Sequence, residues 1–233
     1  MDIITEGIKQ AFILLFTFDP EVIGITRLSL EVSGTATLIS LLIGVSVGTM
    51  IALTQFPGRR IVVSLINTGM GLPPVVVGLF VTIFLWRNGP LGFLEILYTP
   101  TAIIIAQAII ATPIVMGISL AAIQYLPPKL RLQILALGAT RLHQMVWILV
   151  KEARLPLLAA IMARFGGVIS EVGASIMVGG NIKGYTRVLT TATVMETSKG
   201  NFDIAMALSI ILLLLAFLIN AVLTQIQQRE RPL

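Results

Sequence analysis

The feature that most constrains this chain is a series of long apolar runs. The hydrocarbon core of a bilayer is about 30 Å thick, and about 20 apolar residues of helix are needed to cross it. Four charge-free runs exceed that length, at 32–58, 61–86, 96–128 and 204–228. A fifth run, 155–179, is as apolar but contains Arg164 and Glu171. With only 12% charged residues, the chain is predicted to be an all-α, polytopic integral membrane protein with about five transmembrane helices.

The expected layout is a single membrane domain that covers residues 1–233. Its spans are predicted at about 28–55, 61–86, 100–125, 156–179 and 204–227. The polar segment 127–155 is expected to be a cytoplasmic loop, and the segment 180–203 an external loop. Residues 3–18 alternate polar and apolar side chains, which is typical of a helix that lies in the membrane interface. Asp19 and Pro20 are expected to end that helix.

The positions of lysine and arginine predict the orientation, because short cytoplasmic loops carry an excess of these residues. With the N-terminus outside, nine of the 16 lie on the cytoplasmic side: Arg59, Arg60, Lys129, Arg131, Arg141, Lys151, Arg154, Arg229 and Arg231. Six lie outside: Lys9, Arg27, Arg87, Lys183, Arg187 and Lys199. We therefore expect a multi-pass protein of the cell membrane with its C-terminus in the cytoplasm. The same rule explains the net charge of +5, so this charge does not indicate nucleic-acid binding.

The second span contains Pro73 and Pro74 directly after Gly71. Proline lacks a backbone donor and clashes with the preceding turn, so the helix must bend or unwind there. Unwound backbone at membrane depth is tolerated only where protein buries it or where it lines a wet cavity. Pro73 and Pro74 are therefore candidates for a transport pathway or gate. Pro113 predicts a gentler disturbance of the third span.

Arg164 and Glu171 lie well inside the predicted span 156–179, where a charge costs at least about 2.5 kcal/mol. Seven residues apart, they would share one face of a continuous helix, together with the small residue Ser175. Arg164 either faces a cavity that suits an anionic cargo or extends its charged head to the interface. For Glu171 we favour a structural hydrogen-bonding role. An ion-coupled secondary transporter that uses this pair is an alternative at this point.

The polar interruption from Pro127 to Pro156 is predicted to form two short amphipathic helices hinged at Gly138. On the cytoplasmic face of a membrane protein, such a pair suggests a docking element. The chain has no glycine-rich phosphate cradle, His-Glu-x-x-His pair or nucleophile elbow, and it has no cysteine. An enzyme is therefore not expected, and any energy must come from another chain.

Within this loop, residues 132–141 resemble the cytoplasmic signature of ABC importer permeases, in which a glycine is followed ten residues later by isoleucine. Gly138 and Ile148 match that spacing. Two features depart from the pattern: the segment 132–134 is Leu-Gln-Ile instead of Glu-Ala-Ala, and Lys151 replaces a proline.

A second resemblance is to the sulfate, molybdate and tungstate permeases. Residues 170–174 are similar to the Glu-Phe-Gly-Ala motif of these permeases, and residues 179–182, which include Asn181, to their Ala-Gly-Asn-Ile motif. Val172 in place of phenylalanine, with the segments 184–191 and 196–200, is most similar to the tungstate branch.

These resemblances imply a type I ABC importer permease fold and a homodimer in the bilayer. Two cytoplasmic ATPase subunits would bind ATP and Mg, and an oxyanion-binding protein would deliver the cargo from outside. This chain would itself hold no cofactor or metal. Tungstate is the expected cargo, with molybdate or sulfate as the alternative. The resemblance also places contact with the ATPase at Gly138, Ala139, Thr140, Arg141 and Leu142, and it adds Asn181 to the pathway candidates.

Replacing Ala139 with Asp tests the docking assignment. A charge in the contact with the ATPase should uncouple ATP hydrolysis from transport and leave the dimer folded. The measurements are uptake, ATPase activity and pull-down of the ATPase subunit. A variant that still transports and still binds its ATPase would contradict the assignment.

Overall fold

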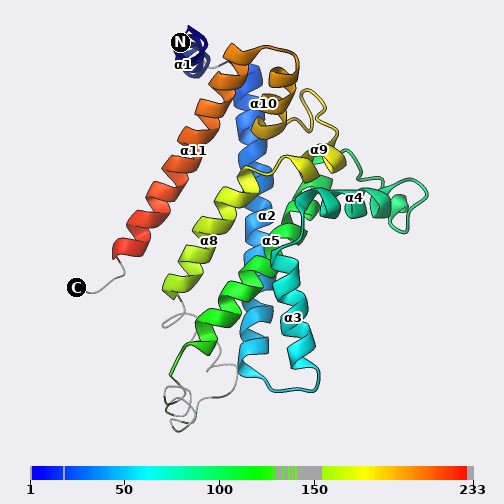
Figure 1. The fold of residues 1–233 in the computed structure, drawn as a ribbon, viewed down its shortest axis with the longest axis vertical. Coiled ribbons are helices and arrows are strands. Elements are labelled where there is room, and N and C mark those ends of the chain that lie inside the picture. The colour runs from blue at the N-terminus through cyan, green and yellow to red at the C-terminus, as the bar shows by residue number, and fades with distance from the viewer. Residues whose placement is uncertain are drawn as a thin grey trace. The chain divides into compact units, whose positions relative to one another are not determined.

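The computed structural model describes residues 2–17, 19–127 and 154–229, with positions 129, 133, 136, 138 and 140. Its helices are α1 (Asp2–Phe16), α2 (Pro20–Leu53), α3 (Arg59–Met70), α4 (Pro74–Leu85), the short 3-10 helix η1 (Gly92–Leu94), α5 (Pro100–Gln124), α8 (Arg154–Ile169), α9 (Gly173–Gly179), α10 (Leu189–Ser198) and α11 (Phe202–Arg229) (Figure 1). These described residues contain no strand. The prediction of an all-α fold is confirmed.

Three helices of the described chain are long and apolar enough to cross a membrane: α2, α5 and α11. Two further pairs pass the same test together, although each is bent at a short break. These pairs are α3 with α4, and the part of α8 from Ala160 with α9. Counting each pair as one span gives up to five spans, which agrees with about five expected from the sequence.

The break between α3 and α4 lies where the glycine and the two prolines predict it. The N–H of Gly71 donates to the carbonyl of Thr68 (3.1 Å), and this tight turn ends α3. Pro73 is extended (φ −64°, ψ 124°), and Pro74 occupies the first turn of α4, where its missing donor costs nothing. The chain bends by 103° at this break. Pro113, in contrast, lies inside α5, and the helix runs on through it.

A second break separates α8 from α9 at residues 170–172, with a bend of 56°. The sequence predicted one continuous helix across 155–179, with Arg164 and Glu171 on the same face. That prediction is wrong, because the regular rotation of about 100° per residue is lost at the break.

The chain divides into two compact packing units. The first contains residues 1–36, 73–107 and 165–222. One core of this unit joins three helices through Val22 and Ile25 of α2, Leu189 and Ala192 of α10, and Leu208 and Ile211 of α11. The buried Ser29 hydroxyl accepts the N–H of Leu189 (2.8 Å). It thereby satisfies a donor at the start of α10 that would otherwise be buried without a partner.

The second unit contains residues 37–72, 108–164 and 223–233. Its core includes Ile51, Ile66 and Leu120, which belong to α2, α3 and α5. Gly44 and Gly48 let α2 approach α5 closely, since a Cβ on Gly48 would lie 2.6 Å from the carbonyl oxygen of Met116. Small residues commonly allow such close approach between membrane helices.

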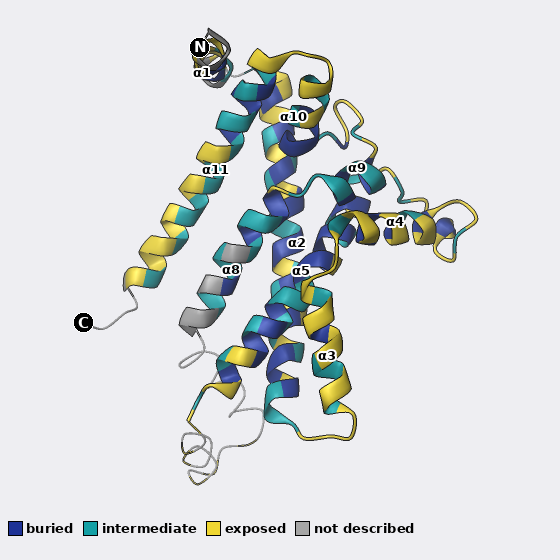
Figure 2. Cartoon of the chain, viewed as in Figure 1, coloured by how far each residue is buried: buried dark blue, intermediate teal, exposed yellow. Residues whose placement is uncertain are grey.

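In the first unit, α4 packs against α9 (Figure 2). Glycines of both helices lie in this contact. A Cβ on Gly78 of α4 would lie 2.8 Å from the Cα of Ala174. A Cβ on Gly173 of α9 would lie 2.7 Å from Cγ2 of Val75. α4 and α9, the helices that follow the two breaks, are therefore in direct contact at these two glycines.

Replacing Gly78 with Ala should destabilise this contact by about 1–3 kcal/mol, because the added methyl group overlaps the backbone of α9. The matched control is Gly24→Ala in α2, where nothing lies within 4 Å of the new Cβ. Helix propensity should stabilise the control by roughly 0.5–1 kcal/mol. Thermal unfolding in detergent measures both changes. Equal stability of the two variants would contradict the packing described here.

Candidate functional site

The break between α8 and α9 is bridged by an amide from a third helix. Gln107 of α5 is only 2% exposed. Its Nε2 donates to the carbonyl of Val168 in α8 (3.3 Å) and to the hydroxyl of Ser175 in α9 (3.2 Å). A polar group left unsatisfied in an apolar medium costs several kcal/mol, so this bridge lets the backbone break at membrane depth.

Glu171 lies at the break itself and takes part in two further hydrogen bonds. Its Oε1 accepts the N–H of Ala174 (3.1 Å), which caps the start of α9. Its carbonyl oxygen accepts the hydroxyl of Thr190 from α10 (3.1 Å). A carboxylate is favourable at the N-terminal end of a helix, where the N–H groups point outward. Glu171 therefore makes the structural hydrogen bonds that the sequence favoured for it.

The end of α9 is closed by a left-handed turn. Gly180 (φ 68°) and Asn181 (φ 51°) both have positive φ, and the amide of Asn181 donates to the carbonyl of Thr191 (3.4 Å). The hydroxyl of Thr186 donates to the carbonyl of Gly179 (2.6 Å) and accepts the N–H of Ile182 (2.9 Å). Asn181 therefore ties the turn to α10.

The structure brings three of the predicted pathway residues together around α9: Glu171, Ser175 and Asn181. Ser175 is only 1% exposed. Pro73 is exposed and directly precedes α4, whereas Pro74 is half-buried and is the first residue of that helix, which packs on α9. Arg164 is half-buried in α8 and belongs to the second packing unit.

The predicted contact with the ATPase lies mostly in the segment that is not described. Ala139, Arg141 and Leu142 are outside the described residues, and Thr140 is exposed. Gly138 has φ 79°, a left-handed conformation that favours glycine. A turn at Gly138 is thus compatible with the predicted hinge.

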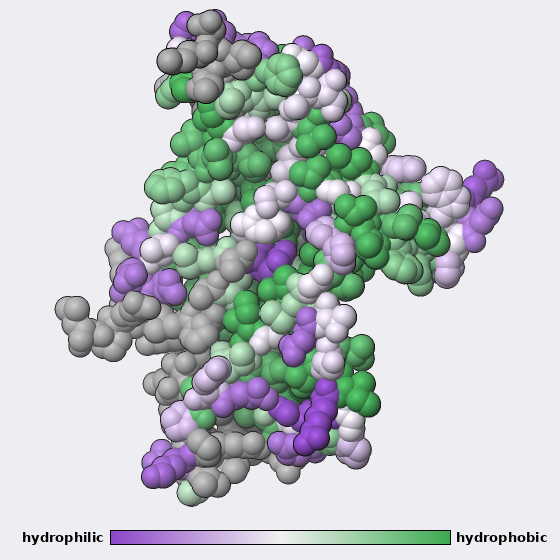
Figure 3. All heavy atoms as spheres, viewed as in Figure 1, coloured by the Kyte–Doolittle hydropathy of each residue, from purple (hydrophilic) through white to green (hydrophobic). Residues whose placement is uncertain are grey.

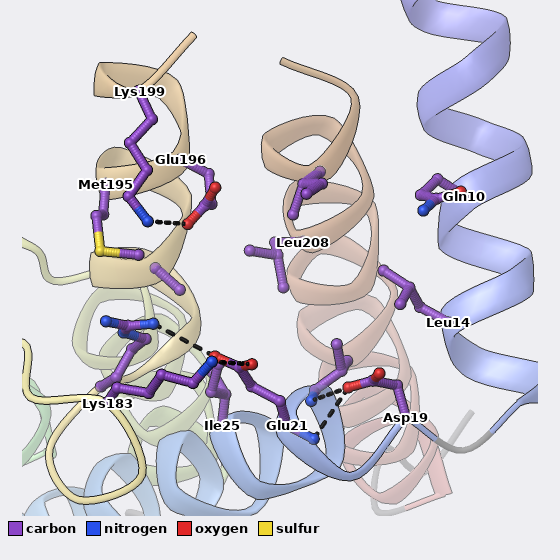
Figure 4. A pocket seen from close by; sticks show the side chains of 14 residues that line it. Gln10, Leu14, Asp19, Glu21, Ile25, Lys183, Met195, Glu196, Lys199 and Leu208 are labelled. Atoms are coloured by element: carbon purple, nitrogen blue, oxygen red, sulfur yellow. Dashed lines mark hydrogen bonds and ion pairs between the residues drawn. The ribbon is translucent and has the colours of Figure 1, made fainter. Parts of the chain in front are cut away.

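A cluster of ion pairs forms a second feature of the first unit. Glu21 of α2 pairs with Lys183 (Nζ to Oε2, 2.7 Å) and Arg187 (Nη1 to Oε1, 3.3 Å). These three residues border two hollows of about 330 and 530 Å³. Figure 4 shows Glu21 and Lys183 meeting at the base of the smaller hollow. This cluster was not predicted from the sequence, although Lys183 and Arg187 in the segment after α9 were a signal for it.

Glu196 and Lys199 lie on the wall of the same small hollow. The amide of Asn201 donates to Glu196 (2.7 Å), and Lys199 pairs with it (2.9 Å). The hydrogen bond from Asn201 and then that from Lys199 hold the pKa of the Glu196 carboxyl below its ordinary value. Glu21 and Glu196 are therefore both engaged by cations of the chain itself. In the described part of the chain, no group of three or more His, Cys, Asp or Glu side chains could hold a metal ion.

Comparison with known proteins identifies the class to which this fold belongs. The family model of the binding-protein-dependent transport system inner membrane component matches residues 40–232. The chain therefore belongs to this family of transport permeases. Most of the chain lies within the match, including both helix breaks and the predicted docking loop.

Individual relatives extend over nearly the whole chain. The tungstate uptake system permease protein TupB of Peptoclostridium acidaminophilum is 40% identical over 228 residues, which cover 98% of this chain and 100% of the relative. A probable anion ABC transporter permease protein of Haloferax volcanii is 41% identical over 212 residues, 89% of this chain and 91% of the relative. A bacterial alginate ABC transporter, solved in complex with an alginate pentasaccharide-bound periplasmic protein, gives a TM-score of 0.80 at 21% identity, over 97% of this chain and 86% of that one. The last match supports the fold, and the predicted ABC importer permease fold is confirmed.

Two substitutions of Glu171 separate its capping bond from its charge. Glu171→Gln keeps an oxygen that can accept the Ala174 N–H, so stability should change little. Glu171→Leu removes the acceptor and should cost about 0.5–2 kcal/mol, as the loss of a helix cap does. Thermal unfolding in detergent and uptake by the assembled transporter measure the two effects. If the glutamine variant loses transport as completely as the leucine variant, the charge matters and the structural role is wrong.

Proposed function

We propose that this chain is the membrane-spanning permease subunit of an ATP-binding-cassette importer for a tetrahedral oxyanion, with tungstate as the cargo. The observation that carries the proposal is the 40% identity to a tungstate uptake permease along essentially its whole length. The motifs around Glu171 and Asn181 support the same substrate class. Molybdate and sulfate, which have the same shape and charge, are the competing cargoes.

The working assembly is a homodimer of this chain with two cytoplasmic ATPase subunits and an extracytoplasmic oxyanion-binding protein. The family description, which names a binding protein and an inner membrane component, supports the binding protein as a partner, and the resemblance of the loop around Gly138 to the ABC permease signature supports the ATPase subunits. ATP and Mg are then bound by the ATPase subunits, outside this chain. The placement of lysine and arginine supports an external N-terminus and a cytoplasmic C-terminus.

Transport proceeds by alternating access. Closure of the ATPase subunits moves the loop around Gly138, which docks through Ala139 to Leu142, and the attached spans carry this motion into the membrane. The packed pair α4 and α9 is the part of the chain best suited to serve as a gate, since each helix follows a break that acts as a hinge. Pro73 and Pro74 form one hinge, and Glu171 and Ser175 hold the other.

The charge of Arg164 fits transport of an anion. A cation at membrane depth attracts an anion that has left its water shell, and it costs less when it faces water. We assign Arg164 to the route of the oxyanion, near the cytoplasmic half of its span. The family assignment leaves the ion-coupled secondary transporter without support, because such a carrier needs no binding protein.

Uptake by the reconstituted complex tests the cargo. The permease, its ATPase and its binding protein are placed in liposomes, and tungsten, molybdenum and sulfur are counted after addition of ATP. We expect uptake of tungstate to exceed that of sulfate by at least about tenfold, a difference of about 1.4 kcal/mol. Omitting the binding protein is the control and should abolish uptake. Equal uptake of the three anions would remove the tungstate assignment, and uptake without ATP would remove the importer class.

A further inference from the structure

Helix α3 has an exposed polar side although it lies in an apolar span. The exposed residues of this side, here called the polar stripe, are Arg60, Ser64, Asn67, Thr68 and Gly71. At about 100° per residue these five positions fall within one arc of about 100°. In Figure 3 the surface over α4 is mainly apolar, whereas that over α3 is a mixture of polar and apolar atoms.

The other two sides of α3 are apolar and differ from each other. Ile66 is buried in the core of the second unit, with Val62 and Val63 packed against it. Ile61 and Leu65 are 67% and 66% exposed, and they form a strip beside the polar stripe. The helix therefore has one side for the core, one that suits lipid or another apolar surface, and one that suits neither.

Polar groups are costly in hydrocarbon, so the polar stripe needs water or a polar partner. Thr68 meets part of this need internally, because its hydroxyl donates to the carbonyl of Ser64 (3.0 Å). The amide of Asn67 is exposed. The stripe also ends at Gly71, where the helix breaks and the backbone itself becomes exposed.

The break at the end of the stripe differs from the break between α8 and α9. Gln107, Glu171 and Thr190 satisfy the second break with side-chain hydrogen bonds. At the first break, Pro73 caps α4 and no side chain makes a capping bond. Exposed backbone in a membrane requires a wet cavity, and the polar stripe leads directly to this point.

We infer that the polar stripe of α3 lines the aqueous route of the oxyanion and contacts the anion as it passes. This inference rests on the proposed function. Amide and hydroxyl donors such as Asn67 and Ser64 carry no charge, and they can donate hydrogen bonds to the oxygens of a tetrahedral dianion. Neutral donors bind an anion more weakly than cations do, so the anion is released again. Arg60 places one cation at the end of the row next to the loop at Gly58.

Single cysteines test this route directly, because the chain contains no cysteine of its own. The variants are S64C, N67C and T68C on the stripe, with I61C and L65C on the adjacent apolar strip as matched controls. The assembled transporter in liposomes is treated with a negatively charged, water-soluble methanethiosulfonate. Since only a hydrated thiolate reacts, the stripe positions should be labelled about tenfold faster than the controls. Tungstate delivered by the binding protein should slow labelling at N67C.

The alternative occupant of the stripe is a second copy of the chain, held by interhelical hydrogen bonds. In that case the reagent labels cysteines on the stripe as slowly as it labels Ile61→Cys and Leu65→Cys, and the inference is wrong. Fast labelling that no oxyanion slows would overturn the contact with the anion. Fast labelling that molybdate or sulfate slows while tungstate does not would support the route and contradict the proposed cargo.

If the cysteine variants assemble poorly, uptake by two other variants of Asn67 tests the same inference. Asn67→Ser keeps a hydrogen-bond donor and Asn67→Leu does not, and both remove the original amide. Uptake should fall at least about threefold more in the leucine variant, a difference of roughly 0.6 kcal/mol. Affinity of the binding protein for tungstate is unchanged in both cases, because that site lies in another chain. Equal uptake by the two variants would contradict contact at Asn67.

Discussion

The structure depends on one constraint: a backbone that leaves its helix inside an apolar medium must find other hydrogen-bond partners. The chain breaks two of its spans and treats the breaks differently. At residues 170–172, Gln107 and Thr190 reach in from other helices, and Glu171 caps the new helix itself. At residues 71–73 no side chain does this. The first solution satisfies the break from within the protein, and the second requires water beside the helix.

The sequence predicted the spans and one of the two breaks, because both have strong local causes. Charge-free runs of bilayer length predict helices, and two adjacent prolines predict an interruption whatever surrounds them. For Pro113 the sequence predicted only a gentler disturbance, and the helix runs on through it. The single proline is accommodated within α5, where its ring packs on Gly69, which has no side chain to displace.

The second break and its partners could not be predicted, because they depend on residues far apart in the chain. Glu171 and Thr190 are 19 positions apart, and Gln107 and Ser175 are 68 apart. A polar residue in a span indicates that a partner exists but not which one. For the same reason, helical periodicity placed Arg164 and Glu171 on a common face that the folded chain does not have. Of the candidate site, the sequence therefore predicted the members around α9 but not the bonds that hold them.

The contact between α4 and α9 has a consequence for how such transporters diversify. Gly78 and Gly173 contribute no side chain to it: Gly78 lies against Cα of Ala174, and Gly173 lies against the side chain of Val75. Side chains that point away from this contact can therefore change over evolutionary time while the two helices keep their spacing. New cargo preferences can arise while the contact between α4 and α9 is kept, provided that these two positions stay without a side chain.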